Sequence, residues 1–155
     1  MNKKNTLLLF LCLFCLWAVA QEKKPVKIAC VGNSITYGSG IKNQFQNSYP
    51  GLLSQLLGEG YDVRNFGISA RVMLNKGDHP YMHEQKFRDL LAFQPDIVTI
   101  KLGTNDSKPW NWRYGKDFKK DLTEMLDILQ ELPSKPKIYL CLPVPAVKRN
   151  FGIND

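Results

Sequence analysis

Four short apolar runs, each ending in turn residues, constrain the fold of this chain more than any other feature of its sequence. The first lies in Lys27–Gly38, KIACVGNSITYG, where four apolar residues lead directly into Gly32-Asn33-Ser34. Such a run is too short for a helix, and an apolar burst that ends in turn residues is typical of a buried parallel strand. The segment therefore predicts a strand whose carboxyl end presents Ser34.

Helical segments separate the runs. Strands are expected over about 26–31, 61–66, 97–102 and 138–142, and helices over about 48–57, 84–92 and 116–132. Ser48 is the expected N-cap of the first helix, with Pro50 in its first turn. Its apolar stripe consists of Leu52, Leu53, Leu56 and Leu57. Strands that alternate with helices imply an α/β fold in which right-handed crossovers join parallel strands.

The N-terminus reads as a targeting signal. Lys3 and Lys4 precede an apolar run, Leu7–Trp17, which is followed by Ala18-Val19-Ala20. A basic stretch, a short apolar stretch and an A-x-A site are typical of a signal peptide, and the run is short for a membrane span. We therefore expect a signal peptide over 1–20, one domain over 21–155, a secreted or periplasmic location, and no stable membrane anchor after cleavage.

The net charge bears on nucleic-acid binding, and the cysteines bear on a possible disulfide. The formal net charge is +7, and removal of the signal lowers it to about +5, scattered along the chain. A scattered excess does not favour nucleic-acid binding. Cys30 and Cys141 remain in the mature chain, inside apolar runs. They are interpreted as buried small hydrophobes, and a disulfide between them stays open.

Three polar or glycine positions follow successive strands. Ser34, Gly67 and Asn105 come after the first, second and third strand. Each has an ordinary explanation, because serine caps turns, glycine makes them and asparagine caps loops. Together they supply a hydroxyl, backbone N–H groups and a side-chain amide donor, which is what acyl transfer requires. A phosphate-binding loop is the weaker alternative, since neither G-x-x-x-x-G-K-[ST] nor G-x-G-x-x-G follows the strand.

Three blocks of sequence carry a family resemblance. The segments GNSIT at 32–36, NFG at 65–67 and GTND at 103–106 resemble the first three blocks of the SGNH (GDSL-type) hydrolases. The resemblance implies a flavodoxin-like, three-layer α/β/α sandwich and needs no metal or other cofactor. It implies that Ser34 is the nucleophile and that the Ser34 N–H, the Gly67 N–H and the Asn105 amide form the oxyanion hole. The wider segment GTNDSKPWNW most resembles secreted carbohydrate esterases grouped with sialate O-acetylesterases.

The chain departs from the family pattern at two places. Asn33 stands where the name-giving motif has aspartate, at a position that is not the nucleophile. The D-x-x-H block, which supplies the general base and its orienting carboxylate, does not occur in the sequence. We expect that block beyond Asp155 and interpret the chain as the N-terminal part of a longer domain. His79 and His83 lie outside any such motif and are assigned no role.

The hypothesis is a serine esterase that removes acyl groups, in particular acetyl, from a carbohydrate such as sialic acid or a plant glycan, with little activity in this portion alone. Trp110 and Trp112 either pack the Asn105 loop onto the sheet or form an aromatic wall for the sugar. The rival functions are a non-catalytic carbohydrate-binding module on the same fold and a phosphate or flavin binder.

Overall fold

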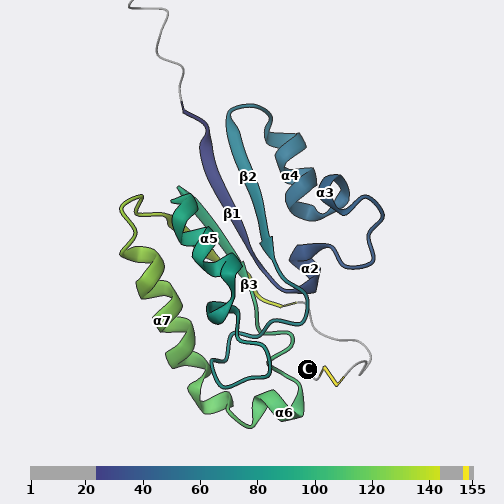
Figure 1. The fold of residues 1–155 in the computed structure, drawn as a ribbon, viewed down its shortest axis with the longest axis vertical. Helices are drawn as coiled ribbons and strands as arrows, with labels where there is room; N and C mark the ends of the chain where they lie inside the picture. The colour runs from purple at the N-terminus through teal and green to yellow at the C-terminus, as the bar shows by residue number, and fades with distance from the viewer. Residues whose placement is uncertain (1–23, 144–151, 154–155) are drawn as a thin grey trace, which may run out of the picture.

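The computed structural model describes residues 24–143 and 152–153, in which four parallel strands form one sheet (Figure 1). The strands are β1 (Val26–Gly32), β2 (Tyr61–Gly67), β3 (Ile97–Lys101) and β4 (Lys137–Leu140). Their order across the sheet is β2-β1-β3-β4, and every pairing is parallel. The four predicted strands are confirmed to within two residues at each end.

Helices lie on both faces of this sheet. The helix α4 (Tyr49–Leu57) joins β1 to β2, α5 (Gln85–Phe93) joins β2 to β3, and α7 (Phe118–Gln130) joins β3 to β4. Figure 1 shows α4 on one side of the sheet and α5 and α7 on the other. This is a doubly wound α/β/α arrangement, as predicted, and the connections from β1 and β3 run in opposite directions across the sheet. The switch point between β1 and β3 is where folds of this kind bind ligands.

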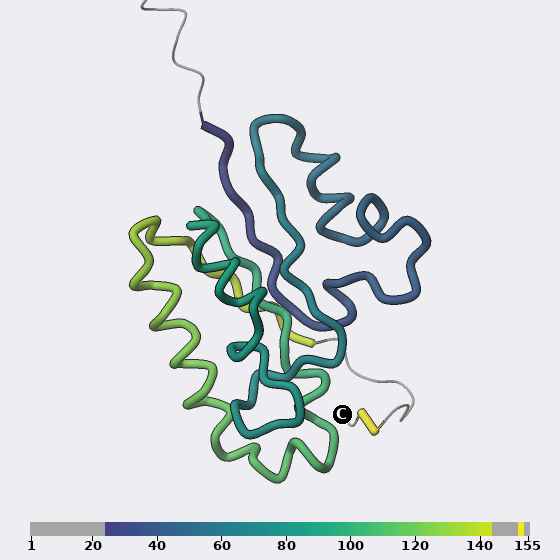
Figure 2. Tube along the Cα trace, in the orientation of Figure 1, coloured from purple at the N-terminus to yellow at the C-terminus, as the bar shows by residue number. Residues whose placement is uncertain are grey.

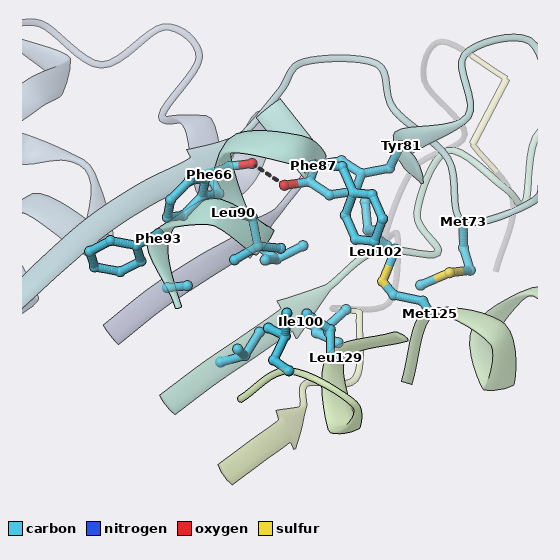
Figure 3. Packing of buried hydrophobic residues seen from close by; sticks show 14 residues of the cluster. Phe66, Met73, Tyr81, Phe87, Leu90, Phe93, Ile100, Leu102, Met125 and Leu129 are labelled. Atoms are coloured by element: carbon cyan, nitrogen blue, oxygen red, sulfur yellow. Dashed lines mark hydrogen bonds between the residues drawn. The ribbon is translucent and has the colours of Figure 1, made fainter. Parts of the chain in front are cut away.

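The core lies between the sheet and the pair α5 and α7. Alternate strand residues point to this side, among them Ala29, Val31, Val98 and Ile100, and all four are buried. Figure 3 shows Phe66 and Leu102 meeting side chains of both helices here. The cluster is completed by Met73, Tyr81, Phe87, Leu90, Phe93, Met125, Leu129 and Leu132.

The opposite face is covered over β1 and β2 only. Tyr49 of α4 reaches across it, with its hydroxyl 3.2 Å from the Thr99 hydroxyl. The predicted leucine stripe does form α4, but Leu52 and Leu56 are 46% and 83% exposed. Tyr139 of β4 is also exposed on the described surface. The predicted stripe is therefore only partly buried. No described helix covers β3 and β4 on this side.

Three further short helices were not predicted. They are α2 (Ser34–Tyr37), α3 (Gln44–Asn47) and α6 (Pro109–Trp112), and each has four residues. Four residues make about one turn, which is too little for an apolar periodicity to show in the sequence. Ser48 precedes α4 as expected, although its side chain makes no capping hydrogen bond.

Candidate active site

Ser34 is the first residue of α2 and lies directly beyond the carboxyl end of β1. Asn33 precedes it as the N-cap, and its Oδ1 accepts a hydrogen bond of 3.0 Å from the Ile35 N–H. Capping uses a single side-chain oxygen, so asparagine meets this requirement as well as aspartate does. Ser34 itself is half-buried, which leaves part of its side chain open to solvent.

The close approach of α2 to the sheet explains the glycine at position 32. A Cβ atom on Gly32 would lie 2.1 Å from the Thr36 Oγ1 and 2.8 Å from the Lys101 carbonyl oxygen. Any larger residue would therefore push α2, and with it Ser34, away from the end of β3.

Gly67 ends β2, opposite Gly32 in the strand register. A Cβ atom on Gly67 would lie 2.4 Å from the Tyr37 amide nitrogen, so this glycine too is needed for α2 to pack on the sheet. The Gly67 N–H donates to Asn65 Oδ1 at 2.9 Å, and the residue is buried. This N–H, which the family resemblance assigns to the oxyanion hole, therefore already has a hydrogen-bond partner in this structure.

The Asn65 side chain makes hydrogen bonds to both α2 and Gly67. Its side-chain Nδ2 donates to the Thr36 carbonyl oxygen at 3.0 Å, while its Oδ1 accepts the Gly67 N–H. The two ends of one amide thus join the C-terminal end of β2 to the helix that begins with Ser34. No sequence pattern singles out Asn65 for this role, because the role depends on the packing of α2.

Asn105 lies in the loop beyond β3 and is only 6% exposed. Its Nδ2 donates to the carbonyl oxygen of Arg71 at 3.1 Å. Since β1 and β3 are neighbours and Gly32 pairs with Lys101, the Ser34 and Asn105 segments leave the sheet at the same edge, at the switch point. The structure therefore brings the segments that carry these two predicted residues to one end of the sheet.

Ala70 is a candidate donor that the sequence analysis missed. It has a φ of +68°, in the left-handed region that favours glycine. Its neighbour Ser69 lies 2.6 Å from Ser39 between the two hydroxyl oxygens, and its other neighbour, Arg71, accepts the Asn105 bond. Within the described residues no hydrogen bond from the Ala70 N–H is found. An alanine in a polar loop carries no sequence signal of that conformation.

The loops after β2 and β3 are joined by buried side chains, and Figure 2 shows their paths next to each other beneath the sheet. Asp106 is fully buried and accepts the N–H groups of Met73 and Leu74 at 2.9 and 2.8 Å. Burial raises the pKa of Asp106, and these two backbone hydrogen bonds offset part of the rise. Asp121 of α7 accepts the Asn75 N–H at 2.7 Å in the same way.

The two tryptophans predicted to contact substrate are both about half-exposed, Trp110 at 47% and Trp112 at 54%. The Trp110 indole N–H donates to Asp78 at 3.0 Å. Trp112 packs against Phe118, with 6.1 Å between the ring centroids. Each ring is thus anchored by a neighbouring side chain and partly exposed; the packing interpretation is supported, and a contact with a sugar stays a prediction.

His79 and His83 are the two histidines of the chain. Both are exposed and come just before α5, and neither imidazole makes a hydrogen bond to Ser34 in the described structure. The described residues therefore contain no histidine placed as a general base for Ser34.

The other chemical possibilities find little support in the described part of the chain. It holds no group of three or more histidine, cysteine or acidic residues that could bind a metal ion. A groove of about 910 Å³ runs along β2, α3 and α4, and neither Ser34 nor Asn105 lines it. Across residues 24–143 no helix is long and apolar enough to span a bilayer.

The disulfide left open by the sequence is not formed, since Cys30 and Cys141 are both free. Cys30 lies in β1 and Cys141 directly follows β4, with β3 between these strands. Two strand spacings are about 9.5 Å, which exceeds the Cα separation that a disulfide can bridge. Cys30 is buried, as predicted, but Cys141 is exposed, so the interpretation as buried residues holds for one of them only.

Comparison with known proteins identifies the family. The model of the GDSL-like lipase/acylhydrolase family matches residues 30–155. The chain belongs to this family. The match confirms the predicted resemblance and accounts for the parallel sheet with Ser34 at the end of β1.

One curated relative of this GDSL-like chain is an acetylxylan esterase from Xylanibacter ruminicola. The two are 48% identical over 153 residues, which cover 88% of this chain and 32% of the relative. The chain thus spans about a third of the length of the curated relative that it matches.

Solved structures of esterases share the fold of this GDSL-like chain. An aryl esterase of M. smegmatis has a TM-score of 0.63 at 24% identity, covering 77% of this chain and 65% of that one. Est24, a carbohydrate acetylesterase from Sinorhizobium meliloti, has a TM-score of 0.62 at 21% identity, with coverage of 77% and 65%. At these identities the likeness supports the fold alone.

Proposed function

We propose that this chain forms part of a carboxylic ester hydrolase that removes acetyl groups from a carbohydrate. One observation carries the proposal: the segments bearing Ser34 and Asn105 leave β1 and β3 at the switch point of a GDSL-like fold. The identity of 48% to an acetylxylan esterase supports the same reaction class.

The nucleophile is the Ser34 hydroxyl, which attacks the ester carbonyl carbon. The carbonyl oxygen becomes an oxyanion, the alcohol of the sugar leaves, and water later hydrolyses the acetyl-serine. The Asn105 amide and the Ser34 N–H are donors for that oxyanion. The Gly67 N–H is bonded to Asn65 in this structure, so its predicted part requires that bond to open. The Ala70 N–H, which makes no hydrogen bond among the described residues and precedes the residue bonded to Asn105, is the alternative third donor.

A plant glycan is the favoured substrate class. The curated relative is named for acetylated xylan, which is a plant glycan. A sialic acid carries a carboxylate, for which an arginine is the usual partner. Arg71, next to Ala70, is already paired with Glu84 at 2.8 Å. Trp110 and Trp112 are proposed to offer exposed aromatic faces to a neutral acetylated sugar chain.

The 155-residue chain alone is proposed to have little activity. A serine hydroxyl without a general base is a poor nucleophile at neutral pH. His79 and His83 are exposed and make no hydrogen bond to Ser34 among the described residues, which offer no other histidine. For the complete gene product we keep the proposal of export to the periplasm or the medium, based on the signal-like residues 1–20.

The test is an acetate-release assay with the complete gene product on acetylated xylan, with O-acetylated sialic acid as the competing substrate. We expect release from xylan that Ser34→Ala abolishes while the melting temperature is unchanged. Equal release by Ser34→Ala would contradict the nucleophile. Xylan binding without any release from either substrate would favour the rival function, a carbohydrate-binding module.

A further inference from the structure

A buried asparagine next to the Asn105 loop makes three side-chain hydrogen bonds to two other residues. Asn111 of α6 is fully buried. Its Nδ2 donates to the Asn105 carbonyl oxygen at 3.0 Å and to Asp78 Oδ1 at 3.1 Å. Its Oδ1 accepts the Asp78 N–H at 2.9 Å. Two donors and one acceptor on one short side chain are what only an amide supplies.

Asp78 continues this chain of hydrogen bonds to the surface. One carboxylate oxygen accepts from Asn111, and the other accepts the Trp110 indole N–H at 3.0 Å. Asp78 and Asn111 are joined by two hydrogen bonds: the Asp78 backbone N–H donates to the Asn111 amide oxygen, and the Asn111 amide N–H donates to the Asp78 carboxylate. These two bonds fix the orientation of the Asn111 amide. The four residues form one path from Asn105 to the half-exposed ring of Trp110.

The surroundings of Asp78 favour its ionised carboxylate, which accepts both of these hydrogen bonds. Burial opposes ionisation of its carboxyl group, but the hydrogen bonds from Trp110 and Asn111, together with the nearby charges of His79 and Lys108, lower the pKa of Asp78. The carboxylate thus accepts at both oxygens throughout the neutral range. Lys108 lies with its ammonium 5.6 Å from the centre of the Trp110 ring and adds a second constraint on that ring.

The path connects two groups with different tasks in the proposed reaction. Asn105 is a proposed oxyanion donor, so its placement affects the transition state and hence kcat. Trp110 is a proposed sugar contact, so its placement affects binding and hence KM. Trp110 lies in a helix of only four residues, which gives the ring little support from its own backbone.

We infer that Asp78 and Asn111 are positioning residues that hold the oxyanion donor Asn105 and the sugar-binding Trp110 in one fixed arrangement. The inference rests on the proposed function and goes beyond it by assigning the substrate-side specificity to the Asp78–Trp110 hydrogen bond. Neither positioning residue contacts the reacting atoms. They act through the residues that they hold.

A double-mutant cycle in the complete gene product tests the inference. The variants are Asp78→Asn, Trp110→Phe and their combination, assayed for acetate release from acetylated xylan. Asp89→Asn is the matched control, because Asp89 is an exposed aspartate of α5 that bonds only Gln85 at 2.9 Å. We expect Asp78→Asn to raise KM and lower kcat by about tenfold each, the effect of one charge-assisted hydrogen bond. Asp89→Asn should match the wild type.

The combination distinguishes positioning from a general loss of stability. Trp110→Phe keeps an aromatic face but has no N–H for Asp78, so the KM effect of Asp78→Asn should vanish in that background. The kcat effect should persist, since it runs through Asn111. Additive KM effects, or Asp78→Asn kinetics within twofold of the control, would overturn the inference.

A spectroscopic readout separates this inference from the proposed function. In protein labelled with 15N-tryptophan, the Trp110 indole resonance is identified by its loss in Trp110→Phe. We expect Asp78→Asn to move it upfield, because an N–H donated to a carboxylate is strongly deshielded. A wild-type protein that releases no acetate would contradict the proposed function. In that case the indole resonance alone tests the positioning inference, and an unchanged indole shift in Asp78→Asn would overturn that inference too.

Discussion

The Tyr81 hydroxyl donates a hydrogen bond of 2.7 Å to the carbonyl oxygen of Phe66, and Tyr81 is fully buried (Figure 3). Phe66 is the next-to-last residue of β2, whereas Tyr81 ends the loop that contains Ala70 and Asp78. One buried bond therefore fixes the far end of the site loop to the sheet edge from which it departs.

Tyr81→Phe removes that bond and leaves the Phe66 carbonyl oxygen buried with one partner fewer. We expect the free energy of unfolding to fall by about 1–3 kcal/mol, the cost of a lost buried partner. Chemical denaturation measures it. Tyr61→Phe is the control, because Tyr61 is 38% exposed, and it should change stability by less than about 0.5 kcal/mol. Equal losses in both variants would mean that the buried bond contributes nothing.

Gly67→Ala should displace α2, since the new Cβ would lie 2.4 Å from the Tyr37 amide nitrogen. We expect a loss of about 1–3 kcal/mol from this overpacking and reduced activity through the shifted Ser34. Gly60→Ala is a matched control, because no atom lies within 4 Å of its Cβ position and its φ is not positive. It should be neutral or slightly stabilising. A Gly67→Ala protein as stable as Gly60→Ala would contradict the close packing of α2.

Asn105→Ala in the complete gene product should lower kcat by about two to three orders of magnitude, the usual loss for one oxyanion donor. The side chain also bonds the Arg71 carbonyl oxygen, so the melting temperature is measured in parallel. A loss of tenfold or less in a folded variant would reduce Asn105 to a structural loop residue.

Asp106 predicts a pH dependence of stability. Its pKa is raised in the folded state by burial, so the folded protein keeps this proton to a higher pH than the unfolded chain. By linkage, its stability contribution is complete below the unfolded pKa of about 3.9 and declines as the pH rises through the folded value. Asp106→Asn cannot ionise. The free energy of unfolding of the wild type minus that of Asp106→Asn should therefore decrease as the pH rises above about 4. An increase would mean that folding lowers the pKa of Asp106 instead of raising it.

Cysteine alkylation tests the separation of Cys30 from Cys141. Burial raises the pKa of the Cys30 thiol and shields it, whereas Cys141 is exposed. Iodoacetamide at pH 8 should label Cys141 in the native chain and reach Cys30 only after denaturation. Peptide mass spectrometry distinguishes the two sites. A peptide with both cysteines joined, or equal native labelling, would contradict the strand order that separates them.

The strands could be predicted because each is a short run of apolar or β-branched residues that ends in residues typical of turns. The same runs placed Ser34 and Asn105 at one sheet edge. The state of the Gly67 N–H could not be predicted, because its partner, Asn65, has two bonding groups whose directions depend on the packed position of α2. The positive φ of Ala70 and the burial of Asn111 likewise arise from contacts between distant loops.

The two borders of the sheet differ in what they offer to another chain. At β2, Asp62 and Arg64 form an ion pair of 2.8 Å, and charge at a border discourages the addition of a strand. At β4, Tyr139 and Leu140 are 45% and 54% exposed, and Leu142 beyond them is 89% exposed. A strand from another chain is therefore expected to add at β4 rather than at β2. In concentrated solutions of the 155-residue chain, self-association should begin at β4, and a charged residue in place of Leu140 should raise the solubility limit.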